Sequence, residues 1–170
     1  MIREDYILRM IERLSIAIAR VLKLKETNRH QEALATIDET FQQLFGLNTK
    51  TISSLPAESI IELLGISAPE EAQKCFWIAD LIKEEADIYE CKKDFPISES
   101  KYLDSLELYL KGIACGDDKI ISNYLPKIKE VADKVKKCLL PDKDRDRLLG
   151  YYKEIENYPE VKELLLSLLN

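Results

Sequence analysis

Apolar residues recur at the spacing of an α-helix along almost the whole chain, and this periodicity limits the chain to helical folds. Near the start, Met10, Leu14 and Val21 fall on one side of a helix. This i, i+3, i+4, i+7 spacing is typical of a helix that buries one stripe. Arg9 and Arg13 fall on the opposite side. Because no segment alternates between apolar and polar residues over a useful length, the sequence predicts an all-α fold without a sheet.

Glycine and proline mark the ends of seven or eight predicted helices. Gly46 ends one helix and Pro56 begins another, as expected from the backbone preferences of these residues. Pro126 leaves open whether one helix begins there or is kinked there. The predicted helices cover residues 3–24, 30–45, 56–65, 67–92, 98–115, 119–139, 142–155 and 159–170. The residues predicted to cap helix starts are Asn28, Ser98 and the capping box of Ser67 with Glu70.

The composition indicates one globular domain, residues 1–170. The hydrophobic content is 46% and the charged content is 33%, both ordinary for a globular protein. A net charge of −6 argues against nucleic acid, which requires a concentrated basic surface. The apolar run from Leu14 to Ala19 is far too short to cross a bilayer, so no membrane insertion is expected.

The four cysteines and the single histidine do not form a recognisable metal site. Cysteines at 75, 91, 115 and 138 are widely spaced, with no CxxC pair, and His30 is alone. Three of the first five residues are charged, and they lead directly into an amphipathic helix, unlike a secretory signal. We therefore expect reduced, mostly core-filling thiols in a cytoplasmic protein, with no metal and no cofactor.

The segment from Glu70 to Gly116 carries a pattern of small and aromatic residues on two successive helices. Ser105, Tyr109 and Gly112 lie where the second helix of a tetratricopeptide repeat carries small, aromatic and small residues. Small residues let two helices approach closely, and an aromatic ring fills the remaining gap. The pattern predicts antiparallel hairpins stacked as a tetratricopeptide-like right-handed array, or alternatively as an irregular bundle.

The opening of the chain, Ile2 to Ile11, resembles the start of a family of small bacterial helical proteins of unknown function. The shared features are an acidic residue followed by tyrosine, Asp5 and Tyr6, and an arginine three residues later, Arg9. An amphipathic helix and a helical hairpin follow. The resemblance implies an all-helical, tetratricopeptide-like fold and implies no activity, cofactor or catalytic residue.

The carboxylates of the segment 84–90 are interpreted as a solvated helix face. Glu84, Glu85, Asp87 and Glu90 have no local partner that marks them as buried. Asp80 differs, because apolar residues surround it in the sequence. We expect Asp80 to be partly buried, where its carboxylate requires a partner.

No catalytic motif is present, so the sequence favours a non-enzymatic module that binds a protein or peptide partner. Its candidate contact residues are Trp77, Tyr89, Tyr102 and Tyr109. One alternative is a self-associating structural protein, in which Ile16 or Leu166 forms the contact of a homodimer. Another is a small-ligand binder or enzyme with a pocket that no motif reveals; a deep polar pocket with converging carboxylates favours this alternative.

Overall fold

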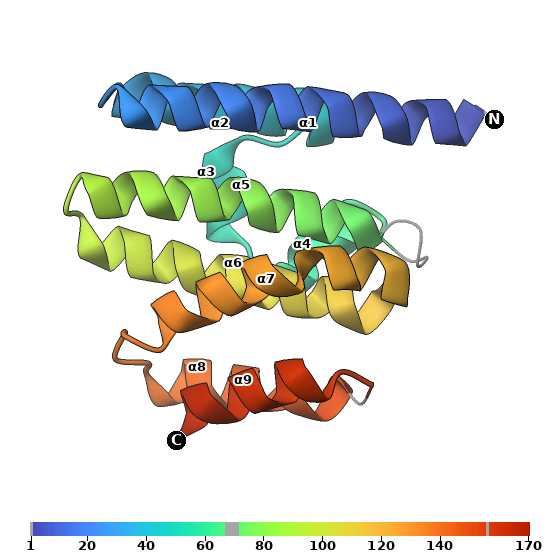
Figure 1. Cartoon of the computed structure of the whole chain (residues 1–170), viewed down its shortest axis with the longest axis vertical. Helices are drawn as coiled ribbons and strands as arrows, with labels where there is room; N and C mark the ends of the chain where they lie inside the picture. Colours follow the sequence, from blue (N-terminus) through green and yellow to red (C-terminus); the bar gives the residue numbers. More distant parts are fainter. Residues whose placement is uncertain (1, 67–71, 156) are drawn as a thin grey trace.

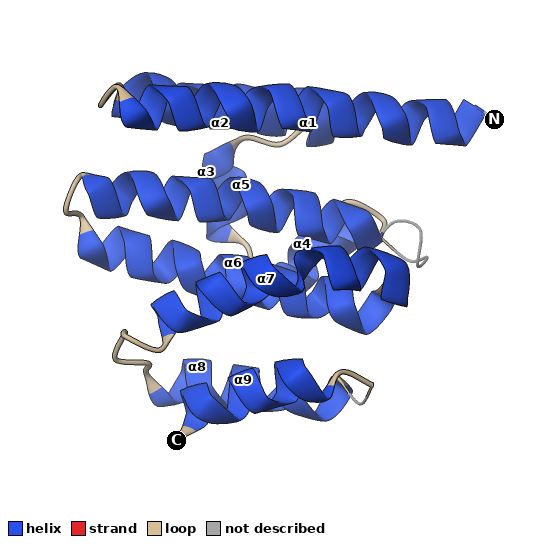
Figure 2. Cartoon of the chain, viewed as in Figure 1, coloured by secondary structure: helices blue, strands red, loops and turns tan. Residues whose placement is uncertain are grey.

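The computed structural model of the chain describes residues 2–66, 72–155 and 157–170. The described residues form nine α-helices and no strand, which confirms the all-α prediction (Figures 1 and 2). None of these helices is both long enough and apolar enough to cross a membrane. The helices are α1 (Ile2–Glu26), α2 (His30–Phe45), α3 (Thr49–Ser54), α4 (Ala57–Leu63), α5 (Ala72–Cys91), α6 (Phe95–Cys115), α7 (Asp118–Val135), α8 (Asp142–Glu154) and α9 (Pro159–Leu169).

The helices are stacked as successive antiparallel pairs, with the α5–α6 pair in the middle. The pair α1–α2 lies on one side of α5, and the pair α8–α9 lies at the other end of the stack (Figure 1). Helix α7 contacts α6 and α9 and so joins the central pair to the last one. The short helices α3 and α4 connect α2 to the central pair, and α4 packs against α6. One hydrophobic core runs through the whole stack.

The number and ends of the helices differ from the prediction at several points. Helix α3 was not predicted; the side chain of Asn48 caps it by accepting a hydrogen bond from the Thr51 amide. Helix α7 is continuous from Asp118 through Pro126, so it does not begin at the proline. It ends at Val135, four residues before the predicted end at 139.

Two predicted N-caps are wrong. Asn28 is not a cap but a turn residue with a φ of 57°, a left-handed conformation that asparagine tolerates better than most residues. Ser98 lies inside α6, which begins at Phe95 with Pro96 in its first turn. The hydroxyl of Ser98 instead donates to the carbonyl of Ala86 at 2.9 Å. The predicted capping box of Ser67 and Glu70 lies outside the described residues.

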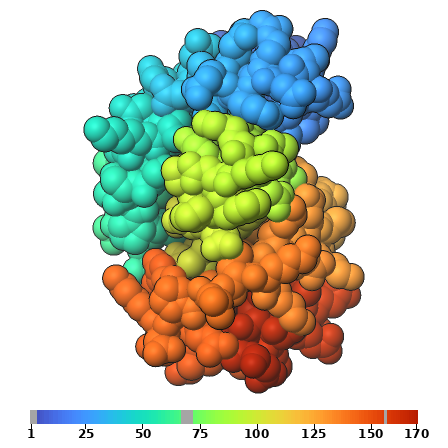
Figure 3. Space-filling model, turned by 90° about the vertical axis from the view of Figure 1, so that its left-hand side faces the viewer, coloured from blue at the N-terminus to red at the C-terminus, as the bar shows by residue number. Residues whose placement is uncertain are grey.

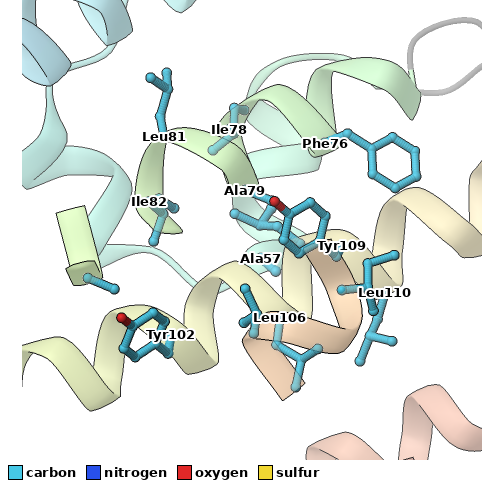
Figure 4. Close-up of a cluster of buried hydrophobic side chains, with 14 of the residues drawn as sticks. Ala57, Phe76, Ile78, Ala79, Leu81, Ile82, Tyr102, Leu106, Tyr109 and Leu110 are labelled. Atoms are coloured by element: carbon cyan, nitrogen blue, oxygen red, sulfur yellow. The ribbon is translucent and has the colours of Figure 1, made fainter. Parts of the chain in front are cut away.

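Helices α5 and α6 are in close contact at the small residues that the sequence singled out. The hydroxyl of Ser105 donates to the carbonyl of Ala79 across the interface at 2.8 Å. A Cβ atom on Gly112 would lie 2.9 Å from the ring of Phe76. Figure 4 shows Ala79 and Phe76 of α5 facing the side of α6 that carries Tyr109. The prediction of a closely packed hairpin is therefore confirmed.

The cysteines are free thiols, but most do not fill the core as predicted. Only Cys75 is buried; Cys91 and Cys115 are exposed, and Cys138 is half-buried. Burial raises the pKa of the Cys75 thiol to about 12, so this thiol stays protonated at neutral pH. The three others lie at or just beyond the ends of α5, α6 and α7, where the core no longer covers them.

Candidate functional site

The aromatic residues predicted to contact a partner lie mostly in the core. Trp77, Tyr102 and Tyr109 are buried, and only Tyr89 is half-exposed. The hydroxyl of Tyr102 donates to Asp87 at 2.7 Å. Neighbouring parts of the chain cover the three buried rings, so three of the four are closed to a partner in this structure.

The prediction that the carboxylates of α5 form a solvated face is wrong, because neighbouring helices cover them. Glu84 is buried, and Lys25 of α1 contacts both Glu84, at 2.7 Å, and Asp87, at 2.9 Å. Burial alone would raise the pKa of Asp87, but the hydrogen bond from Tyr102 and the charges of Lys83 and Lys25 outweigh it and lower the pKa. Since these charges are paired, we interpret them as a structural network between α1 and α5.

Glu85 and Asp80 are also buried and paired. Glu85 is 2% exposed and binds the ammonium group of Lys101 at 2.8 Å, and Lys101 also reaches Ser53 of α3. Asp80 accepts a hydrogen bond from the hydroxyl of Tyr109 and binds Lys127 at 2.7 Å. The prediction that Asp80 is buried and needs a partner is confirmed. We interpret both clusters as structural, since each buried carboxylate is paired with a lysine of another helix.

A different group of charged residues lines an open cleft of about 240 Å³ between α4, α6 and α8. Helix α6 forms its floor, with α4 as one wall and α8 as the other. Figure 3 shows the face on which residues 49–66 (cyan) approach α8 (orange). We call this cleft the α4–α6–α8 cleft; the residues that line it are Pro56, Ala57, Glu58, Glu107, Lys111, Arg147, Gly150, Tyr151 and Glu154.

Glu107 is the most unusual residue of the α4–α6–α8 cleft. It is 3% exposed, and its Oε1 atom accepts no hydrogen bond from any described residue. The Nη1 atom of Arg147 lies 3.3 Å from this same Oε1 atom, within ion-pair distance but without the geometry of a hydrogen bond. The Nε atom of Arg147 is also buried without a partner in the described part of the chain. A buried carboxylate oxygen without a donor costs free energy, so this pair is incompletely satisfied.

The pKa of Glu107 reflects this environment. Burial raises it to about 7, against the opposing charge of Arg147. The carboxylates of Asp104, Asp144 and Glu58 contribute to this rise in the pKa. Burial likewise raises the pKa of Asp104 to about 6. Glu107 is therefore only partly ionised at neutral pH and is sensitive to any charge that enters the cleft.

Lys111 connects the two walls of the α4–α6–α8 cleft. Its ammonium group lies 3.1 Å from Glu58 of α4 and 3.5 Å from Glu154 of α8. It also lies 5.1 Å from the centre of the Tyr151 ring, a cation–π distance. The cleft thus combines carboxylates, two paired cations and an aromatic wall.

Sequence reasoning did not identify this cleft, because its residues come from separate helices without a local motif. Glu107 and Arg147 are far apart in the sequence and meet only when α8 packs against α6. Within the described residues, no group of three or more His, Cys, Asp or Glu side chains has the arrangement of a metal site.

No family model, no curated protein and no solved structure matches this chain. The resemblance of its first residues to a bacterial helical family therefore stays a prediction.

Proposed function

We propose that the chain is a cytoplasmic, non-enzymatic module with a tetratricopeptide-like stack of hairpins, which binds a protein or peptide partner at the α4–α6–α8 cleft. The observation that carries the proposal is Glu107, a buried carboxylate that lines the cleft and accepts no hydrogen bond at Oε1 within the described residues. A partner group that donates to this oxygen would remove the cost of leaving it unsatisfied.

The size and shape of the cleft favour a partner chain over a small molecule. Pockets for small ligands typically enclose about 300–1,000 Å³. The α4–α6–α8 cleft measures about 240 Å³ and is open to solvent, which suits one side chain of a larger partner. Because α4 and α8 rise on either side of α6, a peptide lying across them would place one side chain over Glu107.

The composition of the cleft favours binding over catalysis. A carboxyl group whose pKa is near 7 suits general acid–base chemistry. The described residues that line the cleft include no serine, cysteine or histidine that could act as a nucleophile beside it. Arg147 and Lys111 each already contact carboxylates of the chain, as expected for groups that shape a binding surface.

Site-specific photo-crosslinking tests the proposal. A photoreactive residue replaces Gly150, which lines the cleft, and in a second protein it replaces Ile16 of α1, which is 64% exposed at the other end of the stack. In extract of the source cells, we expect a discrete crosslinked partner from position 150 and none from position 16. Equal products from both positions, or none from position 150, would contradict the proposal.

Self-association through α1 is a second candidate, because this helix exposes several large apolar side chains. They are Tyr6, Leu8, Ile16 and Leu22. Charged residues separate Leu8, Ile16 and Leu22 from one another along the helix, as is common on the surface of monomers. Light scattering of the whole chain at micromolar concentration tests this candidate. A dimer that becomes a monomer on Ile16→Lys supports it, and a strict monomer rejects it.

A further inference from the structure

The geometry points to a cationic side chain, lysine or arginine, within a basic segment of the partner as the group that enters the α4–α6–α8 cleft. This inference rests on the proposed function and names the chemistry of its site.

The balance of charge in the cleft is negative. Its lining contains the carboxylates of Glu58, Glu107 and Glu154 but only the two cations Lys111 and Arg147. Asp144 also binds Arg147 and takes up part of the positive charge that faces Glu107. Carboxylates in excess of their cations attract a further cation, and the attraction is stronger where the site is shielded from water.

Hydrogen bonding at Glu107 leads to the same conclusion. Its Oε1 atom lies 3.3 Å from Nη1 of Arg147 but accepts no hydrogen bond from any described residue. An ammonium or guanidinium group carries only donors, so it supplies what this oxygen lacks. The ring of Tyr151 already lies at a cation–π distance from Lys111, and its face offers an apolar wall for the aliphatic stem of an incoming side chain.

An anionic group fits the cleft poorly. Lys111 already lies between Glu58 and Glu154, and Arg147 contacts both Glu107 and Asp144. An incoming carboxylate or phosphate would have to displace one of these pairs. It would also face the remaining carboxylates at close range, where like charges repel each other.

Cation binding at Glu107 is expected to depend on pH. The charged groups that face this carboxyl are Arg147 and Asp144 of α8, Glu58 of α4 and Asp104 of its own helix. Because the pKa of Glu107 is about 7, a bound cation would favour its ionised form and release a proton. We expect affinity to rise about tenfold between pH 6 and pH 8, as the ionised fraction of this carboxyl grows.

Fluorescence anisotropy with short labelled peptides tests the inference on the whole chain. The probes alternate glycine with lysine, with glutamate or with serine. We expect the lysine probe to bind at least tenfold more tightly than the other two. Because the chain carries a net charge of −6, a general attraction for basic peptides must be separated from binding in the cleft.

A matched pair of variants distinguishes binding in the cleft from general attraction to the negative chain. Glu107→Gln removes one carboxylate inside the cleft, and Glu62→Gln removes one from the exposed surface of α4 outside it. We expect Glu107→Gln to lower the affinity for the lysine probe at least tenfold and to abolish the pH dependence of that affinity. We expect Glu62→Gln to change the affinity less than twofold. Gly150→Phe fills the cleft from an exposed position without changing charge, so it should also abolish binding. Equal effects of Glu107→Gln and Glu62→Gln would overturn the inference.

The two proposals fail in different ways. If position 150 crosslinks a partner but the lysine probe does not bind, the inference of a cationic side chain is wrong, and the proposal of an interaction module is retained. If the lysine probe binds in the cleft but no protein crosslinks at position 150, the interaction module is wrong, and with it the assignment to a partner's basic segment.

Discussion

The close packing of α5 and α6 makes Gly112→Ala a sharp test of this structure. In a helix, alanine is normally more favourable than glycine by about 1 kcal/mol. Here the added Cβ atom would lie 2.9 Å from Cζ of Phe76 and 3.0 Å from two further ring atoms. Ordinary van der Waals contact begins at 3.4 Å, so the ring must move away by about 0.5 Å, the difference between 3.4 and 2.9.

The ring of Phe76 has little room for that movement. It is fully buried and stacks on the ring of Tyr124, with centroids 4.4 Å apart. Overpacking of this kind typically costs about 1–3 kcal/mol. After the gain from helix propensity, we expect Gly112→Ala to lower the free energy of unfolding by up to about 2 kcal/mol. In a chain of this size, each kcal/mol lowers Tm by about 2–4 °C.

Gly150→Ala is the matched control. Gly150 also lies within a helix, α8, but apart from its two neighbours in the chain and the backbone of its own helix, no atom of the described residues lies within 4 Å of its added Cβ. The same substitution should therefore raise the free energy of unfolding by about 0.5–1 kcal/mol. Urea unfolding followed by circular dichroism measures both. If Gly112→Ala is as stabilising as Gly150→Ala, the close contact of α5 and α6 is refuted. In a Phe76→Leu background, Gly112→Ala should cost less, because the smaller side chain leaves space for the Cβ.

Two further predictions concern buried charge. Lys101→Met should lower the free energy of unfolding by about 3–5 kcal/mol at pH 7, because it leaves the buried Glu85 without its cation; the double variant with Glu85→Gln should recover most of the loss. For Glu107, the folded state holds its proton more tightly than the unfolded state, since its pKa is about 7 rather than 4.5. Stability should therefore fall as pH rises from 4.5 to 7, by up to about 3 kcal/mol, and Glu107→Gln should flatten that fall in urea unfolding at several pH values. An unchanged slope in this variant would show that the carboxyl is not buried as described.

The sequence determined the helical nature of the chain, because the information lies in residues a few positions apart. The periodicity of α1 and the stop at Gly46 act locally, so these helices were predicted with nearly the right ends. The close approach of Ser105 and Gly112 was also predicted, because small side chains on one face of a helix let a neighbouring helix come close. Helix α3 was missed because a six-residue helix is too short to show a clear period.

Only the tertiary structure decided which charged residues are buried. Glu84 and Glu85 lie on α5 like many exposed carboxylates, and their burial depends on α1 and α6, whose lysines are distant in the sequence. The α4–α6–α8 cleft arises in the same way, when Glu107 meets Arg147 of a later helix. A helix pattern states which face is apolar, but it does not state which neighbour covers a polar face. That depends on how the hairpins stack, so the sequence determined the elements and the packing determined the candidate site.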